Sequence, residues 1–174
     1  GYKSYSLRWL YSESAADPSG DASVYKSAVE PAAGDAAGEE ALENRFFRLT
    51  PDGKGGVYLE DKRTGRRYGG LGTLIDGGDA GDEYNYSPPS EDRSVGVEES
   101  SISARIESDG ARSSLKVEGT LLLPVSLSKD RKKRSEELVA CPYELRARLD
   151  PASPRVDLSV TLTNYAKDHR LRIA

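Results

Sequence analysis

Turn signals recur along this chain at short intervals, and this recurrence limits the possible folds more than any other feature. Clusters of proline, glycine, aspartate and serine lie at residues 50–53, 62–65, 108–110 and 150–154. The segments between them are short, and several alternate apolar and polar residues with the two-residue period of a strand. The clearest alternation is that of Leu115, Val117, Gly119, Leu121 and Leu123. No segment has a convincing helical period, so the sequence predicts an all-β fold, an antiparallel β-sandwich.

Composition divides the chain into three parts. Residues 2–11 alternate well enough for a strand, with Tyr5, Leu7 and Trp9 on one face. From Ser12 to Gly38 the chain is rich in alanine, serine, glycine and acidic residues, and it has too few bulky apolar residues to offset the entropy of ordering. We therefore expect a strand over 1–11, a linker or poorly ordered loop over 12–41, and the β-sandwich domain over 42–174.

The overall charge and the residue counts exclude several classes of function. The net charge is −4, so we expect no general attraction to nucleic acid or to anionic membranes. No apolar run approaches the roughly 20 residues that span a bilayer, and no signal peptide opens the chain. Methionine is absent even from position 1. We therefore expect this sequence to be part of a longer polypeptide.

The residues that usually hold zinc are scarce. The chain has one histidine, His169, and one cysteine, Cys141, without the paired spacing of a zinc site. The same scarcity argues against a Ser-His-Asp catalytic triad. We expect a structural role for His169 and a buried, small apolar role for Cys141. The basic run at residues 129–134 has no interleaved aromatic residues, so we expect a solvated hairpin tip there.

The stretch 76–89, DGGDAGDEYNYSPP, is the most informative candidate site. Its glycines and its two prolines exclude a helix. Its carboxylates exclude a buried strand, because each buried charge would need a partner. An exposed loop between two strands remains, and such loops often carry function. A calcium loop stays open as an interpretation, although the spacing does not match an EF-hand.

The second half of this loop suits a sugar. In an extended chain Tyr84 and Tyr86 would lie on one face, and Glu83 and Asn85 on the other. Tyrosine rings offer a flat apolar surface for stacking, and nearby carboxylates and amides accept hydrogen bonds from hydroxyls. The alternative is that the tyrosines pack inward and the acids only solvate the loop. The predicted substrate-binding residues are Asp79, Asp82, Glu83, Tyr84 and Tyr86.

Several motifs resemble one known family. They are LEN at 42–44, LEDKRTG at 59–65, DAGDEYNYSPP at 79–89 and NYAKDHRLR at 164–172, with GYKSY at 1–5. Together they resemble the C-terminal β region of glycoside hydrolase family 38, the α-mannosidases that include bacterial mannosylglycerate hydrolases. The stretch 12–38 matches nothing in the pattern.

The resemblance implies a retaining, zinc-dependent α-mannosidase whose catalytic barrel lies elsewhere in the same polypeptide and holds the zinc ion. This chain would then contain no catalytic residue, no metal ligand and no cofactor of its own. It would pack on that barrel as a truncated piece of a supersandwich like that of galactose mutarotase, with residues 1–11 closing a preceding small β domain. The acidic loop would lie on the active-site rim, with Asp82, Glu83 and Tyr84 touching an α-mannoside or positioning barrel residues. A bacterial cytoplasmic location and a homo-oligomer are further expectations.

Two other classes of function remain open from the sequence. One is a stand-alone carbohydrate-binding module, which weak sugar binding by the chain alone would favour. The other is a structural or oligomerisation domain, which dimerisation through an exposed apolar face would favour.

Overall fold

The structure is a computed structural model that describes residues 30–32, 41–82, 84–108 and 113–174. The described elements are eleven strands and one short 3-10 helix. The strands are β1 (Glu30–Ala32), β2 (Ala41–Glu43), β3 (Phe47–Pro51), β4 (Val57–Asp61), β5 (Arg66–Leu71), β6 (Leu74–Gly78), β7 (Ser103–Ser108), β8 (Ser113–Pro124), β9 (Leu138–Leu149), β10 (Val156–Leu162) and β11 (His169–Ile173). The helix is η2 (Glu99–Ser101).

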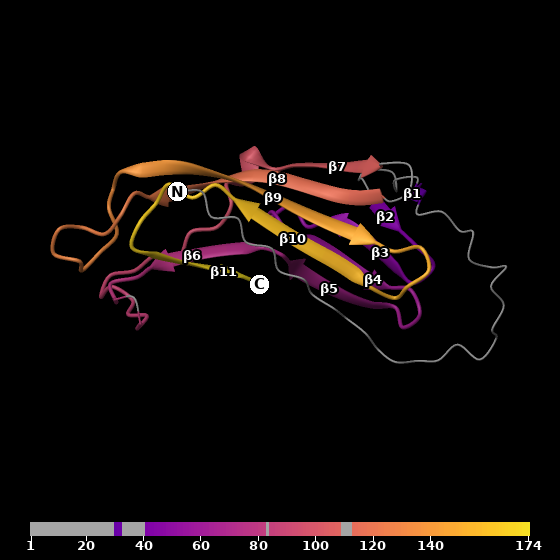
Figure 1. Ribbon diagram of the computed structural model, residues 1–174, viewed down its shortest axis with the longest axis horizontal. Helices are drawn as coiled ribbons and strands as arrows, with labels where there is room; N and C mark the ends of the chain where they lie inside the picture. The colour runs from indigo at the N-terminus through magenta and orange to yellow at the C-terminus, as the bar shows by residue number, and fades with distance from the viewer. Residues whose placement is uncertain (1–29, 33–40, 83, 109–112) are drawn as a thin grey trace.

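The described strands form two facing layers (Figure 1). One layer is a four-stranded sheet in the order β10-β9-β8-β7. The other contains a five-stranded sheet in the order β1-β2-β3-β4-β5 and the β11-β6 pair. Every pairing between these strands is antiparallel. The prediction of an all-β, antiparallel β-sandwich is confirmed.

The long central strands show why the sequence folds in this way. On β8 the alternating apolar residues all face inward, and Leu115, Val117 and Leu121 are fully buried. Each lies opposite a buried residue of β9, so that Val117 pairs with Leu145 and Leu121 with Cys141. The predicted buried position of Cys141 is therefore confirmed. Because side chains alternate across a strand, one register places both apolar sets in the same core.

One glycine in this pair of strands leaves room for the largest side chain of β9. Gly119 lies opposite Tyr143, and a Cβ atom at Gly119 would stand 2.7 Å from Cε1 of that ring. The ring therefore lies over the glycine, and its hydroxyl donates a hydrogen bond to the carbonyl of Gly55, 3.0 Å away. Gly55 belongs to the turn between β3 and β4, so this bond joins the two layers.

The outer face of the β7–β9 sheet is polar and charged. Lys116 on β8 contacts Glu118 at 2.8 Å and Glu144 at 2.9 Å, and Arg146 on β9 contacts Glu107 at 2.7 Å. Opposite charges thus alternate across three strands. The sheet has one apolar and one solvated face, as expected of an antiparallel sandwich.

The strands that lead into the acidic loop are separated by a glycine. β5 ends at Leu71 and β6 begins at Leu74, and Gly72 between them has a φ of +81°. Beyond the acidic loop, η2 precedes β7. The strand expected over 1–11 lies outside the described residues, as does most of the expected linker. Within that linker, Glu30–Ala32 pairs with Ala41–Glu43.

No helix in the described part of the chain is long and apolar enough to cross a membrane.

Candidate functional site

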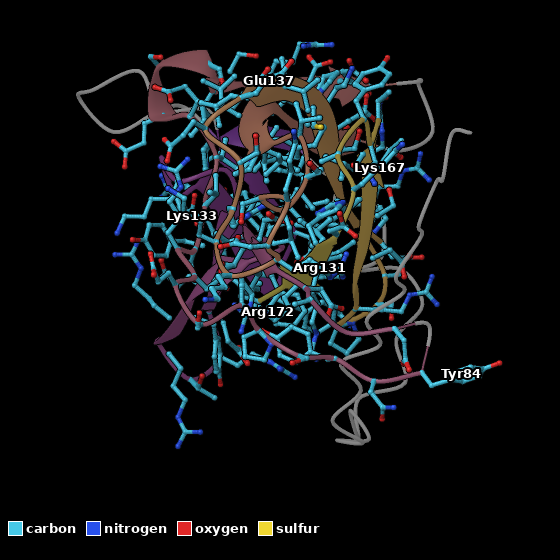
Figure 2. All side chains as sticks on the ribbon, turned by 90° about the vertical axis from the view of Figure 1, so that its left-hand side faces the viewer. Tyr84, Arg131, Lys133, Glu137, Lys167 and Arg172 are labelled. Carbon is cyan, nitrogen blue, oxygen red and sulfur yellow. The ribbon has the colours of Figure 1, made fainter. Side chains whose placement is uncertain are left out.

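The candidate site is a loop that leaves the sandwich at the end of β6. We call residues 79–90 the tyrosine loop. Its two ends are held together because the backbone N–H of Gly78 donates to both carboxylate oxygens of Asp92, at 3.0 and 3.1 Å. Inside the loop, the N–H of Ala80 donates to the carbonyl of Ser87 at 2.6 Å. Figure 2 looks at this end of the molecule and shows Tyr84 projecting away from the body.

Two of the predicted site residues organise the backbone of this loop. Oδ1 of Asp79 accepts hydrogen bonds from the N–H groups of Gly81 and Ser87, at 2.9 and 3.1 Å. Oδ1 of Asp82 accepts from the N–H groups of Tyr84 and Asn85, both at 2.9 Å. These bonds lower the pKa of the Asp82 carboxyl, chiefly through the N–H of Tyr84 and then that of Asn85. Each aspartate therefore fixes a turn through local bonds.

The two tyrosines differ in their surroundings. Tyr84 is 88% exposed, while Tyr86 is 47% exposed and has the guanidinium of Arg170 4.4 Å from its ring centroid. The alternative in which both tyrosines pack inward is not what the structure shows. The backbone bends at Tyr84. Glu83 lies outside the described residues, and its predicted role stays a prediction.

A second loop lies against the first. Residues 125–137, which we call the basic loop, connect β8 and β9, and the N–H of Glu91 donates to the carbonyl of Lys132 at 2.9 Å. The guanidinium of Arg131 lies 3.4 Å from the carbonyl oxygen of Gly81 and 3.5 Å from the carboxylate of Asp168. Arg131 and Asp168 are also the described non-glycine residues with positive φ, 56° and 51°. Such backbone strain often marks functional segments.

Asp76 was predicted to lie in an exposed loop, and this prediction was wrong. Asp76 belongs to β6 and is fully buried. Its carboxylate pairs with Arg134, whose side chain is also buried, and with Nδ1 of His169 at 2.5 Å. These partners lie 58 and 93 residues away in the sequence, so no local pattern could reveal them.

The same contacts correct the prediction for the basic run. Its tip is exposed as expected, but Arg134 points into the molecule and also donates to the carbonyl of Arg93 at 3.2 Å.

A structural role for His169 is consistent with its contact to Asp76. One sequence signal could have placed Asp76: Leu74 is buried on the same strand, and the two-residue period puts position 76 on the same face.

The described residues do not fit a metal site. No three His, Cys, Asp or Glu side chains among them come together as ligands. The carboxylates of the tyrosine loop accept bonds from their own backbone.

The fold and the loop define a class: an antiparallel β-sandwich that carries an exposed aromatic loop at one end, with no metal site among the described residues. No family model matches the chain. It is 28% identical over 146 residues to a protein of Halalkalibacterium halodurans provisionally named mannosylglycerate hydrolase, covering 75% of this chain and 16% of that protein.

Two solved structures from Enterococcus faecalis match the fold. One, an α-mannosidase, has a TM-score of 0.67 at 25% identity and covers 76% of this chain and 17% of its own. The other, a protein of glycosyl hydrolase family 38, has a TM-score of 0.66 at 26% identity, and the match covers 76% of the present chain and 18% of that protein. The chain is therefore related to the α-mannosidases of glycoside hydrolase family 38. It corresponds to their C-terminal β region and spans about a sixth of the length of these relatives.

Proposed function

We propose that this chain is the non-catalytic β-sandwich part of a zinc-dependent, retaining α-mannosidase. In this proposal it packs on the catalytic barrel of the same polypeptide and contributes the tyrosine loop to the rim of the active site. The relationship to family 38 and the partial coverage of each relative support it. The zinc belongs to the barrel, and the substrate is an α-mannoside.

The observation that carries the proposal is the state of Tyr84. Its ring is 88% exposed, yet Asp82 fixes the backbone beneath it by two hydrogen bonds. An exposed aromatic ring on an ordered turn can stack on a sugar face with little loss of conformational entropy. A single exposed ring is common on protein surfaces, so the proposal depends on the ordered turn that holds this ring at the loop.

The test compares two tyrosines in the complete polypeptide. We expect Tyr84→Ala to lower kcat/KM on an aryl α-mannoside at least tenfold, which is about 1.4 kcal/mol of transition-state stabilisation. The control is Tyr58→Ala. Tyr58 is 39% exposed on β4, and Figure 1 shows this strand far from the loop end of the sandwich. Equal zinc content must be verified in both variants. An unchanged kcat/KM in Tyr84→Ala would contradict the rim position.

A second candidate is a stand-alone carbohydrate-binding module, which the exposure of Tyr84 and Tyr86 also favours. Titration of the 174-residue chain with α-mannosides separates the two. Binding that Tyr84→Ala abolishes, in a polypeptide without α-mannosidase activity, would favour the module. A bacterial cytoplasmic location remains a prediction and needs localisation of the complete polypeptide.

A further inference from the structure

A buried group of three charged or polar side chains lies beneath the tyrosine loop. The carboxylate of Asp76 is fully buried, and the side chains of Arg134 and His169 are 2% and 9% exposed. One carboxylate oxygen accepts from Nη2 of Arg134, and the other lies 2.5 Å from Nδ1 of His169. A carboxylate can only accept, so Nδ1 of the histidine carries the proton in this contact.

These three side chains come from three separate segments. Asp76 is the third residue of β6, Arg134 ends the basic run of the basic loop, and His169 begins β11. The backbone of Asp76 also exchanges two hydrogen bonds of 2.8 Å with Val95, which lies beyond the other end of the tyrosine loop. Arg134 reaches the same segment through the carbonyl of Arg93. The group therefore joins both ends of the tyrosine loop to two other parts of the chain.

The surrounding backbone bonds show what this group holds in place. The N–H of Asp79, the first residue of the loop, donates to the carbonyl of Asp168 at 2.9 Å, directly before His169. The N–H of Glu91, after the loop, donates to Lys132 in the basic loop. Each end of the tyrosine loop is thus bonded to a segment that also contacts the Asp76 carboxylate. One segment contains Asp168 and His169, and the other contains Lys132 and Arg134. Both bonds join segments that are far apart in the sequence, and their residues are half-buried or exposed, so we expect them to depend on a buried anchor to keep their geometry.

We propose that Asp76 is a positioning residue that sets the geometry of the tyrosine loop through Arg134 and His169. A buried carboxylate cannot itself touch a sugar. It neutralises a buried guanidinium, and removal of one member of such a pair leaves the other as an uncompensated buried charge. Arg134 would then move toward water, and the basic loop and the segment at residues 91–95 would move with it. The effect on catalysis rests on the proposed function, whereas the effect on loop geometry does not.

The first test is hydrogen exchange, read by mass spectrometry on the complete polypeptide. In Asp76→Asn we expect peptides that cover residues 79–95 and 126–136 to exchange at least about tenfold faster, while peptides of β8 and β9 keep their protection. The matched control is Tyr143→Phe, which removes a buried hydrogen bond that joins the layers elsewhere. It should leave the two loops unchanged. Loop exchange within twofold of wild type, or equal acceleration in all peptides, would overturn the proposal.

A milder variant covers the case in which Asp76→Asn does not fold. Arg134→Lys keeps the charge, but an ammonium cannot reproduce the fork that contacts both Asp76 and the carbonyl of Arg93. The same two loops should exchange faster, by a smaller factor. No change in either loop would count against Asp76 as their anchor.

The second test is a double-mutant cycle in kcat/KM on an aryl α-mannoside. Asp76→Asn should cost at least about tenfold in the wild-type background and less than about twofold in the Tyr84→Ala background, because the anchor acts through the loop. An equal loss in both backgrounds would show a merely structural role and overturn the proposal. If Tyr84→Ala alone has no effect, the proposed function fails, and hydrogen exchange still decides the positioning role.

Discussion

The hydroxyl of Tyr143 provides a sharp test of how the two layers are joined. It donates to the carbonyl of Gly55 at 3.0 Å, and both residues are buried. Burial, followed by the negative charge of Asp52, raises the pKa of this phenol, so the hydroxyl stays protonated and remains a donor through the neutral range. Tyr143→Phe removes the donor and keeps the ring over Gly119.

The loss of stability in Tyr143→Phe follows from the Gly55 carbonyl, which loses its hydrogen-bond donor. The carbonyl of Gly55 would be buried without this donor, and an unsatisfied buried acceptor costs about 1–3 kcal/mol. The ring is retained, so no cavity term adds to this figure. We therefore expect Tyr143→Phe to lower the free energy of unfolding by about 2 kcal/mol.

Urea unfolding followed by circular dichroism measures this value, and an unchanged m-value would show that the mutation acts on stability alone. Tyr58→Phe is the control, since Tyr58 lies on the outer face of β4 and is 39% exposed. It should change stability by less than about 0.5 kcal/mol. A loss of the same small size for Tyr143→Phe would refute the claim that this bond joins the layers.

Three further predictions concern other contacts. Asn44→Ala should cost about 1–3 kcal/mol in urea unfolding, because this side chain accepts from two backbone N–H groups and donates to a carbonyl of the β9–β10 turn; the exposed Asn85→Ala should cost less than about 0.5 kcal/mol. Gly72→Ala should cost more than about 1 kcal/mol, since φ is +81° and the new Cβ would stand 2.8 Å from a leucine methyl of β9. The pKa of Glu107 is lowered chiefly by its hydrogen bond to Arg146, so this pair stabilises the fold above the ordinary glutamate pKa and is lost as the pH falls through the lowered one. The difference in urea midpoint between wild type and Arg146→Gln should therefore shrink from pH 7 to acid, and a constant difference would contradict it.

The sequence predicted the parts of the fold that depend on local patterns. The alternation around Leu121 gave β8 its inward face, and the turn residues near Asp150 separated β9 from β10. A positive φ cannot be predicted from a glycine alone: Gly72, directly after β5, has a φ of +81°, and a Cβ there would stand 2.8 Å from a methyl of Leu145 on β9.

The candidate site was predicted in part. The exposure of Tyr84 agrees with an exposed loop, and the turns at Asp79 and Asp82 follow from local side-chain chemistry. The period of β6 could have placed Asp76 on the buried face, but its partners Arg134 and His169 could not be predicted, because they lie 58 and 93 residues away in the sequence. The roles of Asp79, Asp82, Glu83, Tyr84 and Tyr86 toward a sugar remain predictions.

The central claim is that Tyr84 lies at the active-site rim of a complete α-mannosidase. The most direct measurement is tyrosine nitration of the complete polypeptide, quantified by mass spectrometry at Tyr84 and at the half-exposed Tyr165, with and without a competitive mannoside-like inhibitor. The account predicts that the inhibitor slows nitration of Tyr84 severalfold and leaves that of Tyr165 unchanged. Equal nitration of Tyr84 with and without a saturating inhibitor would contradict the account.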